Sequence, residues 1–384
     1  MFSIRQWLFL FIICVTTSCS NTKRIVSSSI ATDITSVKFL GQYTLPHNLS
    51  YKSTVVGGLS GIDYDVINNR YYLISDDRSA INPARFYTAN IFLTQHGIDS
   101  IQLAGVEYLL QSNGVVYPNN KQDKYHAPDP EAIRYKAQND RLIWSSEGER
   151  IVKADGIVLE NPAITIISSK GRYIDTFPLP HNLIMQSTEK GPRQNGVLEG
   201  LTYADNYKTL YVSVEEPLYE DGPRADVTDN NAYIRILKYD VADRKNTQQF
   251  AYKLDPVAYP ANPVNEFKVN GVPDILSIGD NKLLVIERSF STGRLPCTIK
   301  LFIADLKNAT DIMDNPSLKN NNNFIPAEKK LLLNMDALGI YTDNIEGVTF
   351  GPLLPNGHRT LLFVADNNFN FLEKTQFLLF ELTE

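Results

Sequence analysis

Asn344–Phe350 reads NIEGVTF and, after a turn, Leu361–Asp366 reads LLFVAD. An acidic residue leads into the first apolar run, and a second acid ends the other run. Short apolar or alternating runs bounded by Gly, Pro, Asn and Asp are typical of β-strands. The pattern therefore predicts an antiparallel hairpin with an acid at the start of one strand and at the end of the next.

The same hairpin pattern occurs five times along the chain. The lead positions are separated by 71, 68, 75 and 72 residues, and they are Ser60, Glu131, Glu199, Asp274 and Glu346. The second runs of the first four hairpins end at Asp76–Asp77, Glu147, Glu215–Glu216 and Glu287. A near-constant period indicates a circular array in which each repeat is one blade, although these repeats are longer than most propeller repeats.

Further strand-like runs complete the blades. They lie at 85–94, 101–110, 163–168, 173–179, 233–240, 249–254, 298–305, 327–334 and 376–382. The fifth repeat lacks one strand, which Val37–Tyr43 can supply from the other end of the domain, because pairing the termini removes an exposed sheet edge. The sequence thus predicts an all-β fold over residues 37–384, a β-propeller of five four-stranded blades. A sixth blade within the long loops is the alternative, for which we count too few strands.

The first 18 residues are typical of a signal peptide. Arg5 supplies a positive start, and the apolar run Trp7–Val15 is too short to span a membrane. Small residues precede Cys19, as in bacterial lipoproteins in which this cysteine is acylated, and the polar segment 19–36 is typical of a tether. We expect a lipid-anchored protein of the bacterial cell envelope, at the outer membrane, in the periplasm or at the cell surface. Ordinary secretion with Cys19 unmodified is the alternative.

Composition narrows the function classes. The formal net charge of −6 does not favour nucleic-acid binding. After loss of the signal peptide and acylation of Cys19, Cys297 is the remaining cysteine, and its apolar neighbours indicate a buried hydrophobic residue. No cysteine–histidine cluster has zinc-site spacing. We expect a monomer whose contact with the membrane is limited to the N-terminal lipid.

The acids of the hairpins are the candidate metal ligands. Antiparallel pairing places the start of one strand beside the end of the next, so Glu131 would neighbour Glu147. If these hairpins are the inner strands of the blades, their acids gather at one mouth of the channel. Carboxylates so close raise one another's pKa unless a cation lies among them, and Ca²⁺ prefers oxygen ligands. The predicted Ca²⁺ ligands are Glu131, Glu199, Glu215, Asp274, Glu287, Glu346 and Asp366.

Arginines next to these acids are candidates for substrate binding, because the guanidinium group binds phosphate or carboxylate bidentately. They are Arg78, Arg85, Arg150 and Arg288, with Arg294 as a weaker candidate. A metal beside them could act as a Lewis acid or activate water. The predicted catalytic residues are Asp76, Asp77, Glu131 and Glu147. The alternative for each acid is structural: it accepts backbone N–H bonds from the next blade and pairs with an arginine.

The ordered set of motifs carries a family resemblance. It comprises GLSGID at 58–63 with SDDR at 75–78 and RFY at 85–87, DPEAI at 129–133 with SSEG at 145–148, NGVLEGL at 195–201 with Glu215–Glu216, VIERSF at 285–290, and NIEGVTFGP at 344–352 with ADNNF at 365–369. Together these stretches resemble the phytase-like family, described as "esterase-like activity of phytase". The resemblance implies a secreted or surface β-propeller loosely related to calcium-dependent phytases, which remove phosphate from inositol phosphates. Ser60 replaces the acid at the first lead position, so any metal site would be asymmetric.

These observations favour a membrane-tethered, Ca²⁺-assisted hydrolase of phosphoesters or related anionic esters, with a small anionic or phosphorylated substrate. One alternative is a lipid-anchored module that binds a glycan or an anion without turning it over. Another is metal-free glycoside hydrolysis, in which two carboxylates at a defined separation suffice.

Overall fold

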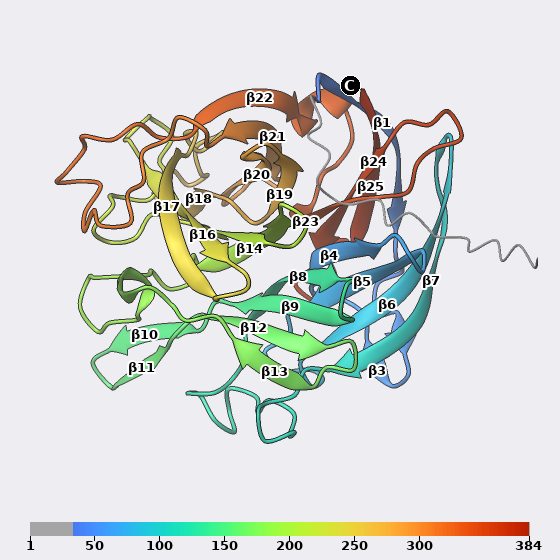
Figure 1. The fold of residues 1–384 in the computed structure, drawn as a ribbon, viewed down its shortest axis with the longest axis horizontal. Helices are drawn as coiled ribbons and strands as arrows, with labels where there is room; N and C mark the ends of the chain where they lie inside the picture. Colours follow the sequence, from blue (N-terminus) through green and yellow to red (C-terminus); the bar gives the residue numbers. More distant parts are fainter. Residues whose placement is uncertain (1–33, 384) are drawn as a thin grey trace, which may run out of the picture.

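The computed structural model describes residues 34–383, which fold into five antiparallel sheets arranged in a ring (Figure 1). The all-β class and the five-bladed propeller are confirmed. Blade 1 contains β4 (Leu59–Asp65), β5 (Arg70–Ser75), β6 (Arg85–Thr94) and β7 (Gly97–Tyr108). Blade 2 contains β8 (Pro130–Lys136), β9 (Arg141–Ser146), β12 (Ala163–Ser168) and β13 (Tyr173–Thr176). Blade 3 contains β14 (Leu198–Ala204), β15 (Thr209–Val214), β16 (Tyr233–Asp240) and β17 (Lys245–Lys253).

Blade 4 has a divided inner strand, and blade 5 closes the ring. Blade 4 contains β18 (Lys268–Gly271), β19 (Ile275–Gly279), β20 (Lys282–Ser291), β21 (Thr298–Asp305) and β22 (Glu328–Asn334), and blade 5 contains β23 (Asn344–Phe350), β24 (Thr360–Asp366), β25 (Gln376–Thr383) and β1 (Ser36–Thr44). The remaining elements are β2 (Ser50–Tyr51), β3 (Thr54–Val55), the hairpin β10 (Glu149–Lys153) and β11 (Gly156–Glu160), and the short 3-10 helices η1 (His181–Leu183) and η2 (Met335–Leu338).

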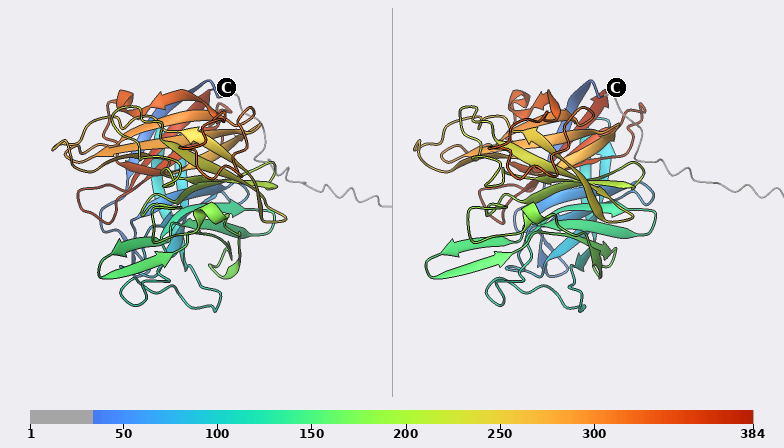
Figure 2. Two further views of the ribbon diagram at one scale, coloured as in Figure 1. Left: turned by 90° about the vertical axis from the view of Figure 1, so that its left-hand side faces the viewer. Right: turned by 60° about the vertical axis from the view of Figure 1, so that its left-hand side comes forward.

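The predicted closure of the ring by the N-terminal strand is confirmed. β1 pairs antiparallel with β25 from Ser36 opposite Thr383 to Thr44 opposite Gln376. The hairpin β10–β11 was not predicted; it is inserted in blade 2 and projects away from the ring (Figure 2). The predicted signal peptide, Cys19 and nearly all of the predicted tether lie outside the described residues. Within residues 34–383, no helix has the length and apolar character needed to cross a membrane.

Among the described residues the core consists of five apolar clusters, each filling the space between two neighbouring blades, and a sixth, smaller cluster of Ala251, Ile312 and Leu318. Between blades 1 and 2, for example, Ile74 of β5 packs in one cluster with Ile133 of β8 and Trp144 of β9. Between blades 4 and 5, Leu284 of β20 shares a cluster with Phe363 of β24. Because each blade is covered by apolar side chains on both faces, the inner strands read as nearly continuous apolar runs, and only their ends carry acids.

Each complete inner strand carries a β-bulge at its lead residue. The register shifts fall between Leu59 and Gly61, Pro130 and Ile133, Leu198 and Leu201, and Ile345 and Gly347. A bulge adds a residue to one strand and re-aims its side chain. The irregularity therefore turns the lead side chain out of the regular ladder, at the end of the strand where the acids lie.

The glycine after a lead residue packs directly against the next blade. A Cβ atom on Gly200 would lie 2.7 Å from the Cα atom of Asp274 in blade 4, and one on Gly347 would lie 2.9 Å from the carbonyl oxygen of Ser60 in blade 1. Real Cβ contacts are longer, and both obstacles are backbone atoms. At these positions the acid therefore supplies a side chain to the mouth, and the glycine that follows it allows two inner strands to approach closely.

We expect Gly200→Val to destabilise the fold by about 3 kcal/mol, because overpacking of a rigid core typically costs about 1–3 kcal/mol and here the neighbour is backbone. Denaturant unfolding followed by fluorescence measures this. Gly156→Ala is the matched control, since a Cβ there has no heavy atom within 4 Å. Equal stability of the two variants would contradict the close-packed ring.

Candidate active site

A cavity of about 810 Å³ lies at the mouth where the inner strands begin. Among the described residues, ten carboxyl groups and three arginines line it: Asp76, Asp77, Asp129, Glu131, Glu147, Glu199, Glu215, Asp343, Glu346 and Glu373, with Arg78, Arg288 and Arg294. Carboxyl groups therefore greatly outnumber cations in the lining. Such an excess repels anions and attracts cations.

Two carboxylate triads meet in this cavity and share Glu131. In the first triad, one oxygen each of Asp76, Asp129 and Glu131 lie within 4.8 Å of one another. In the second, the same holds for Glu131, Glu147 and Glu199. Blades 1, 2 and 3 supply these side chains, so the site requires three consecutive blades to pack side by side. A set made only of oxygen donors fits a hard divalent cation such as Ca²⁺ rather than zinc or copper.

Burial and mutual repulsion raise the pKa values of the triad carboxyls, which favours protons shared between them where no cation separates them. Burial, and then the charge of Glu199, raises the pKa of Glu131 well above its usual range. Burial, and then the charges of Asp129 and Glu215, raises the pKa of Glu147 to about 8, even though a side-chain hydrogen bond with Glu199 and one from the backbone N–H of Val197 oppose the shift. A divalent ion could replace such shared protons, because metal ligands must be deprotonated.

Arg288 connects blade 3 with blade 5. Its guanidinium lies 2.7 Å from Glu215 Oε1 and 3.3 Å from Glu346 Oε1, and it donates a hydrogen bond to Asn344 Oδ1. Burial disfavours its charge, but Glu346 and Glu215 outweigh that effect and raise its pKa. Its Nε is buried without a hydrogen-bond partner among the described residues. Arg288 thus keeps a positive charge in the cavity and an unused donor.

Arg78 lies on the opposite side of the cavity, in the loop after β5. Its Nη1 is 3.0 Å from Glu149 Oε2 and 3.3 Å from Asp129 Oδ2. The side chain is 22% exposed, so part of the guanidinium can contact a ligand in the cavity. Of the four main substrate-binding candidates, Arg78 and Arg288 line the mouth, and the weaker candidate Arg294 lines it as well.

Glu346 and Asp366 belong to the acidic cluster as predicted. Burial, together with Glu215, raises the pKa of Glu346 to about 7 against the opposing effect of Arg288. Asp366 is 1% exposed. After desolvation, its charge is the largest cause of the raised pKa of Asp76. Both carboxyls lie close enough to influence the first triad, and neither belongs to a triad within 4.8 Å among the described residues.

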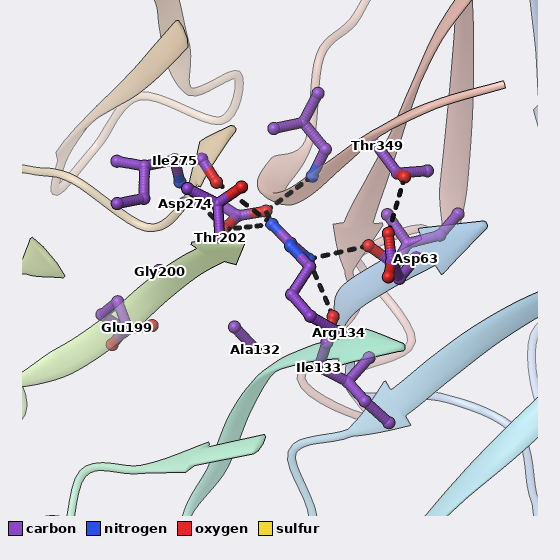
Figure 3. A network of polar contacts seen from close by, with 12 residues as sticks. Asp63, Ala132, Ile133, Arg134, Glu199, Gly200, Thr202, Asp274, Ile275 and Thr349 are labelled. Atoms are coloured by element: carbon purple, nitrogen blue, oxygen red, sulfur yellow. Dashed lines mark hydrogen bonds and ion pairs between the residues drawn. The ribbon is translucent and has the colours of Figure 1, made fainter. Parts of the chain in front are cut away.

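Asp274 does not lie at the mouth, contrary to the prediction that all hairpin acids share it. Its two carboxylate oxygens each lie 2.7 Å from Nη2 of Arg134, inside the channel (Figure 3). It also accepts a hydrogen bond from the backbone N–H of Val348. The reason is Pro273, which cannot donate to a β-ladder and separates β18 from β19. Arg134 lines a second cavity of about 750 Å³ at the other end of the channel, so this ion pair lies between the two cavities.

Glu287 also lies away from the mouth. It accepts hydrogen bonds from Tyr252 Oη at 2.7 Å and from the backbone N–H of Asp255 at 2.9 Å, and it forms an ion pair of 2.5 Å with Lys329. With Asn270 Nδ2 as a further donor, both oxygens are engaged inside blade 4 and its neighbours. Its predicted role as a metal ligand has no support in this arrangement.

Asp77 and Arg85 form a buried pair that organises a loop. Arg85 Nη1 lies 2.7 Å from Asp77 Oδ2, and the Arg85 side chain is 0% exposed. Asp77 also accepts hydrogen bonds from the backbone N–H groups of Ala80, Ile81 and Asn82. Asp77 lines the cavity but its oxygens are occupied, so the geometry favours a structural role over the predicted catalytic one, and Arg85 faces its own blade.

Arg150 contacts a neighbouring surface rather than the mouth. It donates to the carbonyl oxygens of Gln186 and Thr188 and to Tyr219 Oη. Its guanidinium also lies 4.9 Å from the centre of the Tyr219 ring. These contacts fix the loop 186–191 against blade 3. Substrate binding by Arg150 stays a prediction that this arrangement does not favour.

Asp129 and Asn344 are site residues that the sequence reasoning did not select. Asp129 lies two positions before Glu131, and Asn344 lies two positions before Glu346 and donates to its Oε1 at 2.8 Å. Residues at a spacing of two share one face of a strand. That spacing was the available signal, since a polar residue two positions before a lead acid points to the same mouth.

The raised pKa values predict a stability that falls with pH in the absence of a divalent cation. A carboxyl whose folded-state pKa lies above its unfolded value stabilises the fold while protonated, and that stability is lost as the pH rises through the folded-state pKa. For Glu346 and Glu147 this occurs near pH 7 and pH 8. We expect the melting temperature in chelator to be about 5 °C lower at pH 9 than at pH 6. Circular dichroism melts would show this, and Ca²⁺ should remove most of the difference at pH 9. Melting in chelator that is independent of pH would contradict it.

Solved structures resemble this fold at low sequence identity. An endo-arabinase from Bacteroides thetaiotaomicron is 14% identical, with 86% of this chain and 95% of that chain covered and a TM-score of 0.43. An endo-1,4-β-xylanase from the same organism is 9% identical, with 85% and 95% covered and a TM-score of 0.43. The major allergen of Malassezia sympodialis is 15% identical, with 85% and 78% covered and a TM-score of 0.38. At these scores the likenesses carry no argument about activity.

A search of curated proteins found no match. A family model, by contrast, matches residues 54–369, which include all five hairpins and nine of the ten carboxyls that line the mouth. The match covers well over half of the 384 residues. The chain therefore belongs to the phytase-like family, described as "esterase-like activity of phytase".

Proposed function

We propose that this protein is a Ca²⁺-dependent hydrolase of phosphoesters or related anionic esters, with its active site at the acidic mouth. The observation that carries the proposal is the pair of carboxylate triads that share Glu131, beside Arg78 and Arg288 in one cavity. Membership of the phytase-like family supports the same class of reaction.

The charge balance makes the cation a requirement. The ten carboxyls and three arginines of the lining would repel an anionic ester. Both arginines nearest the triads are already paired with acids, Arg288 with Glu215 and Glu346, and Arg78 with Asp129 and Glu149. Anion binding therefore needs additional positive charge, which Asp76, Asp129, Glu131, Glu147 and Glu199 would hold as Ca²⁺ ligands.

The protein's own groups then have distinct tasks. Bound Ca²⁺ would supply Lewis-acid stabilisation of charge on the ester oxygens. Arg288 would orient the anion from blade 4, and Arg78 would do so from blade 1, since both side chains line the cavity. Asp76 is the one triad carboxyl that is partly exposed, whereas the other members are buried. Asp76 would therefore be the ligand most accessible to water or an ester in the cavity.

The test is a hydrolysis assay of the purified full chain against phosphomonoesters, phosphodiesters and carboxylic esters. The protein is first treated with chelator and then given Ca²⁺, Mg²⁺ or Mn²⁺. We expect turnover of an anionic ester with Ca²⁺ and none with chelator. Calcium binding without hydrolysis of any ester would instead favour a binding module, and equal rates in chelator would overturn the metal requirement.

A further inference from the structure

One wall of the acidic mouth is apolar and exposed. Ile81, Leu295 and Leu372 line the same cavity as the triads, and they are 47%, 76% and 62% exposed. They come from loops that join the second and third strands of blades 1, 4 and 5. The triads come from blades 1, 2 and 3, so Leu295 and Leu372 lie on blades that supply no triad residue, whereas Ile81 shares blade 1 with Asp76. We call Ile81, Leu295 and Leu372 the apolar collar.

Partly buried aromatic residues continue the apolar collar towards the acids. Phe290, Tyr341 and Phe369 also line the cavity. Phe290 follows Arg288 on β20 at a spacing of two, and Tyr341 precedes Asn344 at the start of blade 5. Tyr341 Oη donates to the carbonyl oxygen of Leu295, so this aromatic residue lies beside the apolar collar.

Exposed large apolar side chains are ordinary when they are scattered singly, but their convergence on one concave site indicates a ligand surface. An occupant of this cavity meets cation-binding carboxylates and arginines on one side and aliphatic and aromatic groups on the other. The complementary molecule carries charge at one end and hydrocarbon at the other.

We propose that the substrate is an amphiphile whose anionic ester group binds at the triads and whose apolar tail lies against the apolar collar. The position of the ester group rests on the function proposed above, whereas the tail site rests on the collar alone. A membrane surface is the competing explanation for the exposed leucines. The collar lines the inside of a cavity, however, while Phe371, which is 76% exposed and adjacent to Leu372, is not part of that lining.

The experiment measures binding without requiring turnover. Alkyl phosphonates, whose carbon–phosphorus bond resists hydrolysis, are titrated into the Ca²⁺-loaded full chain by calorimetry, with tails of two, six and ten carbons below their micelle concentrations. Each methylene that the collar buries should improve the affinity by up to about fourfold. We expect the ten-carbon compound to bind on the order of 100-fold more tightly than the two-carbon compound, because the tail is only partly covered.

Leu295→Ser and Leu372→Ser test the collar directly. The double variant should lose most of the dependence on chain length and keep the affinity for the two-carbon phosphonate. Phe371→Ser is the matched control, because it removes an equally exposed apolar side chain outside the cavity lining. It should behave like the unmodified protein.

Affinity that does not depend on tail length would overturn the proposal. So would a double variant that loses binding to phosphatidylcholine vesicles while its phosphonate affinities stay unchanged, since the collar would then be a membrane contact. Binding that depends on tail length, without hydrolysis of the corresponding alkyl phosphates, would refute the proposed function and leave the amphiphile site standing. No binding by any phosphonate would refute both.

Discussion

Glu131→Gln is expected to abolish Ca²⁺-dependent hydrolysis, with a loss of at least about 100-fold, because charge stabilisation by a metal ion is worth several kcal/mol and each 1.36 kcal/mol is a factor of ten. Glu131 is the carboxyl that both triads share, so one substitution weakens both. The same change should raise the melting temperature in chelator at pH 9, since it removes a buried charge from a cluster of like charges. Activity and stability thus move in opposite directions.

Calorimetric Ca²⁺ titration, thermal melts and the ester assay together measure this prediction. The control is Glu107→Gln. Glu107 lies in β7 and pairs with Lys170 on the surface. It should leave calcium affinity, activity and stability unchanged. A Glu131→Gln protein that still binds Ca²⁺ with the original affinity would exclude the triads as the metal site.

Arg134→Met should lower the free energy of unfolding by about 3–5 kcal/mol, which is the usual cost of leaving a buried charge without its partner. Arg134 and Asp274 come from blades 2 and 4, and their side chains are 3% and 0% exposed. Burial already raises the pKa of Asp274 to about 6 despite Arg134. Removing Arg134 raises that pKa further, so Asp274 is neutralised more readily in the variant and the loss of stability should be smaller at pH 5 than at pH 8.

Denaturant unfolding at the two pH values tests this prediction. Arg134→Met combined with Asp274→Leu should regain part of the lost stability, because Asp274 no longer leaves an unpaired buried charge, although Asp63 still loses the nearby charge of Arg134. Arg244→Met is the surface control: its ion pair with Asp175 is 38% and 45% exposed, and such pairs contribute about 0–1 kcal/mol. An Arg134→Met variant as stable as this control would show that water or another group satisfies Asp274.

Local sequence patterns were sufficient to predict the blades, but they did not predict the contacts across the ring. The hairpins followed from alternation and turn residues near Ser60, Glu131, Glu199 and Glu346, because hairpin pairing is local. The strand β1 was predictable from a missing partner in the fifth repeat. The acidic mouth followed from antiparallel geometry together with the assumption that these hairpins are the inner strands of the blades. Of these inferences, only that assumption concerns how distant parts of the chain pack.

The channel pair, the buried Asp77–Arg85 pair and the apolar collar could not be predicted in the same way. Arg134 and Asp274 are 140 residues apart in the sequence. Pro273 gave a signal that the fourth inner strand is interrupted, but not where the Asp274 side chain would turn. Similarly, Leu295 and Leu372 are single apolar residues in polar loops, and only the closed ring places them beside one cavity.

The pairing of β1 also determines the direction in which the opening faces. Ser36 lies opposite Thr383, whereas Thr44 and Gln376 lie at the end of blade 5 where Asn344 pairs with Asp366. The chain therefore enters the ring on the side remote from the carboxylates. If the protein is attached to a surface through its N-terminal segment, artificially or through Cys19, the opening should be presented outward, towards molecules that diffuse in solution.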